Sequence, residues 1–217
     1  MNIEQARFNM IEQQIRPWNV LDQDVLDLLH VVKREQFVPQ AYENLAFADV
    51  EIPLPGGEAM LNPKVEARMV QEIAVKKHEN VLEVGTGSGY VAALLAHMAG
   101  QVTSVEILPE SVTQARKNLT RAGITNVTVE EGNGAEGWAK NAPYDAIVVS
   151  GALPLLPEAL IKQLKVGGRL VAIVGEAPAM TCQLVKRTSE TAHDAVTVFE
   201  TNAKPLTGAP TPSRFTF

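Results

Sequence analysis

The chain has 217 residues, of which 46% are hydrophobic and 20% charged, and its formal net charge is −6. This composition supplies a sizeable core and excludes a largely disordered chain. The negative charge argues against nucleic acid as a partner, because phosphate binding requires Lys and Arg clustered on one face. No apolar stretch approaches the roughly 20 residues that cross a bilayer, and the N-terminus lacks a signal-peptide pattern. We therefore expect a cytoplasmic protein with no membrane partner.

No linker or low-complexity segment divides the chain, which predicts a single domain over residues 1–217. Within it we expect three parts: an N-terminal helical cover at 1–60, a cofactor-binding sheet core at 78–200 and a C-terminal tail at 201–217. The tail is proline-rich and ends in two aromatic residues, a pattern suited to packing against the domain or against a second subunit.

Two helices are predicted in the cover, at 4–15 and 22–31, because apolar residues recur there at helical spacing. Neither helix carries the basic polar face of a membrane-surface helix. We therefore expect both to pack on the sheet of this domain.

From residue 81 onward, strands and helices alternate. The predicted strands are 81–84, 101–107, 126–131, 144–150, 169–175, 181–187 and 195–200, and the predicted helices are 90–99, 108–122 and 157–164. Ser111 is a candidate N-cap of the second helix, Gly123 its stop, and 166–168 a turn. Strand–helix alternation predicts an α/β fold with a doubly wound, mostly parallel sheet of seven strands. The last two strands follow one another without a helix, which predicts an antiparallel pair at one edge.

The first of these strands runs into three glycines at alternate positions, Gly85, Gly87 and Gly89. Glycines permit a sharp turn and a close approach of the backbone to a ligand, and the helix that follows offers free N–H groups. This loop predicts a site for a nucleotide-like cofactor.

Two cofactors compete for this loop. The dinucleotide fingerprint G-x-G-x-x-G has a glycine where this chain has Tyr90, whose side chain would crowd a pyrophosphate. Glu83, inside the strand, would repel phosphates but attract a cationic methionine-like group. S-adenosylmethionine carries a sulfonium and no phosphate, and it fits better than NAD.

Two further strand ends support this reading. Glu106 follows Gly85 by 21 positions, close to the roughly 20 typical of an acid that binds ribose hydroxyls. Asn133 follows the third strand, where an adenine could be held. Taken alone, an ordinary turn residue is the favoured interpretation, and the position at the end of the strand is what supports a contact with the base. The carboxyl ends of these strands, with Ser150 after the fourth, are expected to meet at one edge of the sheet.

The sequence offers little for a metal site. Cys182 is the one cysteine, and it lies in a predicted strand, which favours a buried inert thiol over a nucleophile. The four histidines are scattered without ligand spacing. No bound metal is expected.

Over nearly its whole length, the chain resembles the protein-L-isoaspartate O-methyltransferases, which are class I S-adenosylmethionine-dependent methyltransferases. The resemblance is carried by segments 10–16, 32–39, 52–55, 81–90, 132–138 and 142–149. It implies transfer of a methyl group from S-adenosylmethionine to the carboxylate of an L-isoaspartyl residue in a damaged protein or peptide, leaving S-adenosylhomocysteine. It also implies that the N-terminal region covers the cofactor.

The chain departs from the family at the substrate side. The family carries a segment of the type Gly-Gln-Thr-Ile-Ser-x-Pro, whose hydroxyls lie beside the methyl donor and the acceptor carboxylate; here segment 57–63 has Ala59 and Leu61 at those positions. Glu58 adds a charge that would disfavour a carboxylate substrate if it pointed inward, and we expect it to face solvent. The usual Gly-Asp-Gly is Gly-Asn-Gly here, and Asn133 keeps a carbonyl acceptor for the adenine amine.

The catalytic group is not identified, because both family hydroxyls are missing. The substrate-side candidates are Leu61, Asn62 and Ser150. The residues expected to bind the cofactor are Glu83, Gly85, Thr86, Gly87, Ser88, Gly89, Tyr90, Glu106, Ile107, Asn133, Gly134 and Ala135. Three functions stay open: a methyltransferase for isoaspartyl protein or another acceptor, a cofactor-binding protein without catalysis, and an NAD-dependent oxidoreductase.

Overall fold

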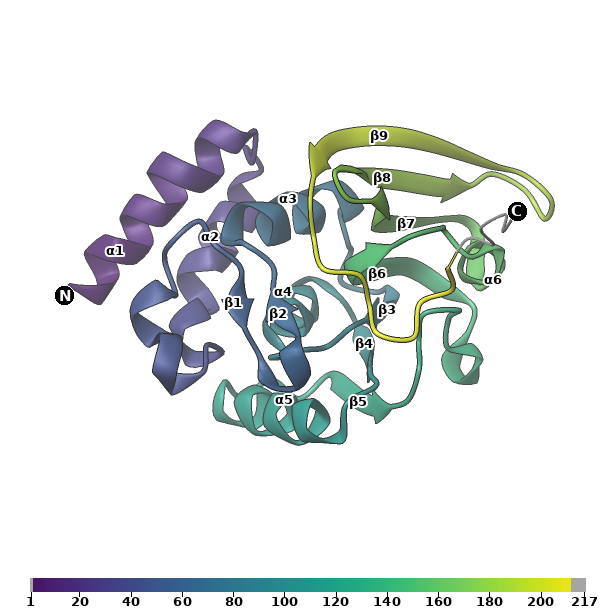
Figure 1. Cartoon of the computed structure of the whole chain (residues 1–217). Coiled ribbons are helices and arrows are strands. Elements are labelled where there is room, and N and C mark those ends of the chain that lie inside the picture. Colours follow the sequence, from purple (N-terminus) through teal and green to yellow (C-terminus); the bar gives the residue numbers. More distant parts are fainter. Residues whose placement is uncertain (1, 212–217) are drawn as a thin grey trace, which may run out of the picture.

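The computed structural model describes residues 2–211 (Figure 1). Within them, seven strands form one sheet in the order β5-β4-β3-β6-β7-β8-β9. The strands β5 to β7 run parallel, and β8 and β9 are antiparallel at one edge, so the predicted sheet is confirmed. The bounds are β3 Asn80–Val84, β4 Gln101–Glu106, β5 Val127–Glu131, β6 Tyr144–Leu153, β7 Leu164–Glu176, β8 Ala179–Arg187 and β9 His193–Thr201.

Helices flank this sheet and precede it. The α-helices are α1 Ile3–Met10, α2 Gln23–Val31, α3 Pro63–Ile73, α4 Tyr90–Met98, α5 Pro109–Arg121 and α6 Glu158–Lys162. A π-helical segment, Ile11–Ile15, continues α1, and short 3₁₀ turns lie at Arg16–Trp18, Arg34–Gln36, Gln40–Leu45, Pro55–Gly57 and Ala139–Asn141. A two-stranded hairpin, β1 Ile52–Pro53 with β2 Ala59–Met60, and α3 were not predicted. No helix in the described part of the chain is long and apolar enough to cross a membrane.

The N-terminal helices lie outside α3 and α4 (Figure 1). Their buried residues, such as Ile15 and Leu26, join one apolar cluster with residues of α4, including Leu94. We expected these helices to pack on the sheet, but they reach it through α3 and α4. Burying their apolar face in this way makes the cover part of the main core.

Two local predictions were wrong. Ser111 is not the N-cap of α5, because Leu108 holds that position ahead of the proline that begins the helix, and Ser111 is buried in the first turn. The expected turn at 166–168 is a bulge inside β7, where the register with β6 shifts and Gly167 has φ +86°.

Gly123 does follow the end of α5 with φ +72°, as predicted. Cys182 is buried in β8, and burial raises the pKa of its thiol to about 12.

A buried ion pair joins the N-terminal cover to α3. Arg34 and Glu66 are 1% and 3% exposed, and Arg34 Nη1 lies 2.5 Å from Glu66 Oε2. The same guanidinium donates to the carbonyls of Leu61 at 2.8 Å and Ala46 at 3.1 Å. Burial raises the pKa of Glu66 to about 7, against the opposing charge of Arg34. One side chain thus fixes the backbone at the segment where the family carries its hydroxyls.

Replacing Arg34→Met is expected to lower the free energy of unfolding by about 3–5 kcal/mol, because Glu66 is left buried without its partner. Urea denaturation at pH 7.5 measures the loss. The double variant Arg34→Met/Glu66→Leu removes both charges and is expected to recover much of the stability. A double variant less stable than the single one would contradict this account.

Candidate active site

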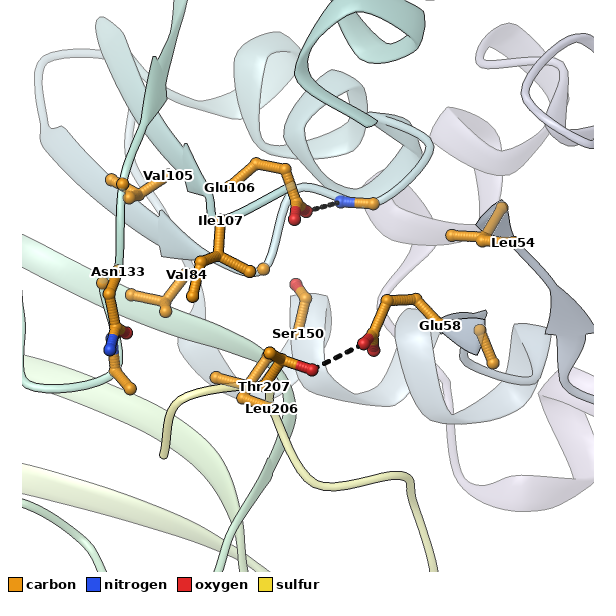
Figure 2. Close-up of a pocket in the computed structure, with 16 residues that line it drawn as sticks. Leu54, Glu58, Val84, Val105, Glu106, Ile107, Asn133, Ser150, Leu206 and Thr207 are labelled. Atoms are coloured by element: carbon orange, nitrogen blue, oxygen red, sulfur yellow. Dashed lines mark hydrogen bonds between the residues drawn. The ribbon is translucent and has the colours of Figure 1, made fainter. Parts of the chain in front are cut away.

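The candidate site is a pocket at the carboxyl ends of β3, β4 and β5, beside Ser150 of β6 (Figure 2). A smaller cavity adjoins it and shares five of its lining residues. The pocket is lined by Leu54, Glu58, Ala59, Val84, Gly85, Gly87, Val105, Glu106, Ile107, Gly132, Asn133, Gly134, Ala135, Ser150, Leu206 and Thr207. The small cavity is lined by Leu54, Ala59, Met60, Leu61, Glu66, Glu83, Gly85, Thr86, Gly87, Ser88, Tyr90, Val91 and Ser150.

Together these two spaces collect the predicted residues with two exceptions, Gly89 and Asn62. Gly89 has φ +85°, and a Cβ there would lie 3.4 Å from the Ala115 side chain, so this glycine permits close packing of α5. Asn62 is the N-cap residue of α3, and its Oδ1 is buried without a hydrogen-bond partner.

The glycine loop is fastened to the end of β4. Gly85 has φ +89°, and its N–H donates to the Val105 carbonyl at 2.9 Å. One carboxylate oxygen of Glu106 accepts from the Gly87 N–H at 2.8 Å, and the other accepts from the Leu108 N–H at 2.9 Å (Figure 2). Each oxygen keeps a further lone pair, and the carboxylate lines the pocket. A pair of ribose hydroxyls is a suitable ligand for it.

Glu83 lies beneath the loop and is fully buried. Its two oxygens accept from Ser104 Oγ at 2.5 Å and Ser150 Oγ at 2.9 Å, and Thr86 Oγ1 lies 2.5 Å from Ser104 Oγ. Burial raises the pKa of Glu83 to about 8, although both serine hydroxyls favour the ionised form. Ser104 was not predicted as a site residue. It lies opposite Glu83 because β3 pairs with β4 in this register, which the sequence alone does not record.

At its other end the pocket is lined by the apolar side chains of Val84, Val105 and Ile107. Gly134 lies so close to Val84 and Val105 that an added Cβ would meet each at 3.1 Å. Asn133 Oδ1 accepts from the Ala135 N–H at 2.9 Å, and its Nδ2 donates to the Gly208 carbonyl at 3.1 Å. This amide group shapes the turn and binds the C-terminal segment, while one lone pair of its oxygen stays available to a base.

Tyr90 is directed into the core. It is 1% exposed, its ring centroid lies 5.5 Å from that of Phe37, and Arg34 lies over the ring at 5.2 Å. Its hydroxyl is buried without a partner beside the small cavity. Ser88 is also buried, and its carbonyl accepts from Asn118 Nδ2 at 2.9 Å.

Glu58 does not face solvent, contrary to expectation. Its side chain is 19% exposed and lines the pocket, where it accepts from Thr207 Oγ1 at 2.7 Å (Figure 2). It also pairs with Lys204 at 3.0 Å. The physical reason is the segment 202–209, which places an ammonium and a hydroxyl beside it. Leu61, 5% exposed, lines the small cavity with Ala59.

Sequence reasoning missed this segment as part of the site. It leaves β9 and crosses the end of β6, drawn in yellow in Figure 1, where Pro205 bridges to Ala152. Leu206 closes over the loop, since its Cδ2 would lie 2.8 Å from a Cβ at Gly85 and 2.6 Å from one at Gly151. We name segment 202–209 the strap. The predicted tail beyond residue 211 lies outside the described residues.

Comparison with known proteins agrees with this geometry. A family model described as protein-L-isoaspartate(D-aspartate) O-methyltransferase matches residues 5–209. A protein-L-isoaspartate O-methyltransferase of Methanoculleus marisnigri is 45% identical over 182 residues, 83% of each chain. Protein-L-isoaspartate O-methyltransferase 2 of Marinobacter nauticus is 38% identical over 208 residues, 95% of each chain.

Two solved structures share the fold. A protein-L-isoaspartate O-methyltransferase superimposes with a TM-score of 0.80 at 25% identity, covering 93% of this chain and 66% of that one. A Plasmodium falciparum protein of the same description, in complex with S-adenosyl-L-homocysteine, gives 0.77 at 18% identity, covering 95% and 98%. The family match spans almost the whole chain and includes the strap, so the chain belongs to the protein-L-isoaspartate O-methyltransferase family.

Proposed function

We propose that this protein transfers a methyl group from S-adenosylmethionine to the side-chain carboxylate of an L-isoaspartyl residue in a protein or peptide. The observation that carries the proposal is the pocket in which Glu106, the glycine loop and Asn133 meet at one edge of a methyltransferase sheet. The members of this family are S-adenosylmethionine-dependent methyltransferases. Because the chain belongs to the family, it is an enzyme of this kind.

The residues present suit this cofactor. Among residues 2–211, the charged side chains that line the pocket are the carboxylates Glu58 and Glu106, with no Lys or Arg. A pyrophosphate would lack a counter-charge there, whereas a nucleoside without phosphates meets no repulsion. This charge pattern disfavours the NAD-dependent alternative.

Each end of the pocket is assigned a part of the cofactor. Glu106 is proposed to bind the ribose hydroxyls, and Ile107 with Asn133, Gly134 and Ala135 the adenine. Gly85, Gly87 and the Glu83 network, together with Thr86 and Ser88, are proposed to hold the methionine end. Tyr90, directed into the core, is assigned to supporting the loop through packing.

For this reaction the protein mainly has to align the methyl donor with the acceptor carboxylate. The donor supplies a methyl group on a sulfonium, and its C–S bond breaks as the acceptor oxygen forms its bond to carbon. The acceptor carboxylate is already ionised at neutral pH, so no general base is required. Ser150 and the buried segment around Leu61 then contribute position and exclusion of water, and an error of 1 Å would cost about a hundredfold in rate.

We also propose that the chain works as one domain, with residues 1–60 as the cover of the site. The contacts of Arg34 with the Leu61 carbonyl and Glu66 support this. Because the family methylates protein, a polypeptide is the expected substrate and partner.

The purified protein is expected to methylate an isoaspartyl peptide and not the matched aspartyl peptide, measured with radiolabelled donor.

Glu106→Gln is expected to weaken donor binding about thirtyfold, a loss of about 2 kcal/mol, because ribose hydroxyls lose a charged acceptor. Calorimetry measures that affinity. Binding of the donor with no transfer to the isoaspartyl peptide would mean another acceptor or lost catalysis, and binding of NAD instead would mean an oxidoreductase.

Donor affinity is expected to rise with pH through the titration of Glu83. In the free protein its pKa is raised to about 8, so the carboxyl is protonated at neutral pH. The cationic donor favours the ionised form, so binding releases a proton and affinity increases by up to about tenfold per pH unit below that pKa. Calorimetry from pH 6 to 9 measures this slope.

Glu83→Gln serves as the matched control, because it removes the titration and keeps the shape of the side chain. The amino group of the donor titrates equally with both proteins, so the difference between the two curves reports on Glu83 alone. Parallel curves for the two proteins would contradict the assignment.

A further inference from the structure

The strap is held across the pocket by contacts at both of its sides. On the sheet side, the Ala152 N–H donates to the Lys204 carbonyl at 2.9 Å, and the Leu206 N–H donates to the Ala152 carbonyl at 2.9 Å. On the cover side, Thr207 Oγ1 donates to Glu58 Oε1, and Lys204 Nζ donates to the Gly57 carbonyl. These contacts place the Lys204 side chain at the rim between strap and hairpin.

The charges at this rim are unbalanced for an anionic acceptor. Glu58 and Glu106 both line the pocket, and each carries a carboxylate. An acceptor carboxylate brings one further negative charge into this space, and a buried or half-buried anion requires a partner. Within the described part of the chain, the lining residues offer no cation, and Lys204 lies next to the lining, where it pairs with Glu58 at 3.0 Å.

Lys204 also has capacity left for a ligand. A lysine ammonium has three N–H donors, and among residues 2–211 the Lys204 ammonium contacts Glu58 and the Gly57 carbonyl. Its side chain is 39% exposed, so the remaining donor is accessible to an incoming group. Glu58 and Gly57 restrict where the ammonium lies, which lowers the entropy cost of using it.

We propose that Lys204 is a specificity-determining residue that binds the acceptor carboxylate, with Glu58 and the Gly57 carbonyl holding its ammonium in position. Thr207 donates to the same carboxylate oxygen of Glu58 that pairs with Lys204. The ammonium of Lys204 would then take over the contact with the acceptor carboxylate for which Ala59 and Leu61 lack a hydroxyl. It rests on the proposed function, since it presumes a carboxylate acceptor.

The test separates recognition of the acceptor from simple closure of the strap. Lys204→Met is expected to raise the dissociation constant and the KM of an isoaspartyl peptide about tenfold, the usual effect of losing one charge-assisted hydrogen bond. Peptide binding is measured by fluorescence anisotropy in the presence of S-adenosylhomocysteine. The affinity for S-adenosylhomocysteine alone, measured by calorimetry, is expected to stay within about twofold, and Lys204→Arg is expected to recover part of the peptide affinity.

A charge swap is the decisive variant. Glu58→Lys/Lys204→Glu keeps an ion pair between strap and hairpin but exchanges the positions of the charges. Peptide affinity is expected to stay low in the swap, because the ammonium no longer lies on the strap. Lys162→Met, which breaks an exposed ion pair of 2.8 Å with Glu158 on α6, is the matched control and is expected to leave peptide binding unchanged.

Three results would overturn the inference: full recovery of peptide affinity in the swap, an unchanged KM in Lys204→Met, or an equal loss of peptide and S-adenosylhomocysteine affinity. Failure of the proposed function looks different. A wild-type protein that binds the isoaspartyl peptide through Lys204 yet transfers no methyl group overturns the function and supports the inference. A wild-type protein that does not bind this peptide overturns both.

Discussion

The carboxylate of Glu106 is the constraint on which the site depends. Its two oxygens accept from the backbone of the glycine loop and from the backbone just before α5, so one side chain sets the spacing between two segments that follow different strands. Gly85 adds a backbone hydrogen bond to the same strand end. Because parallel strands present their carboxyl ends at one edge, a loop fixed there lies over the pocket. The apolar floor and the Glu83 network are arranged around this fixed point.

Local patterns made much of the fold and half of the site predictable. Strands buried on both faces read as apolar runs, and glycines at alternate positions mark a turn that other residues adopt at a cost. Glu106 was found because its distance along the chain from Gly85 follows from one strand, one helix and one turn. Seven strands and the antiparallel edge follow from the same alternation of elements.

The rest depends on contacts between distant parts of the chain, which no local pattern records. Glu58 lies inward because Thr207, 149 positions later, donates to it. Asn133 is a turn residue by sequence, yet its amide reaches Gly208, 75 positions away. Tyr90 adjoins the glycine loop in sequence but packs on Phe37 from the cover, because the start of α4 faces that cluster. In each case packing between elements decides the direction of a side chain.

The place of the strap in the chain has a consequence for synthesis. The glycine loop and Glu106 are made in the first half of translation, but Leu206 and Thr207, which close the pocket, follow the last strand of the sheet. At about 5–20 residues per second, the ribosome synthesises Leu206 and Thr207 several seconds after the glycine loop. A nascent or C-terminally shortened chain therefore lacks Leu206 and Thr207, two of the residues that line the pocket. Folding of the edge strands β8 and β9 becomes the step that delivers the strap and completes the enzyme.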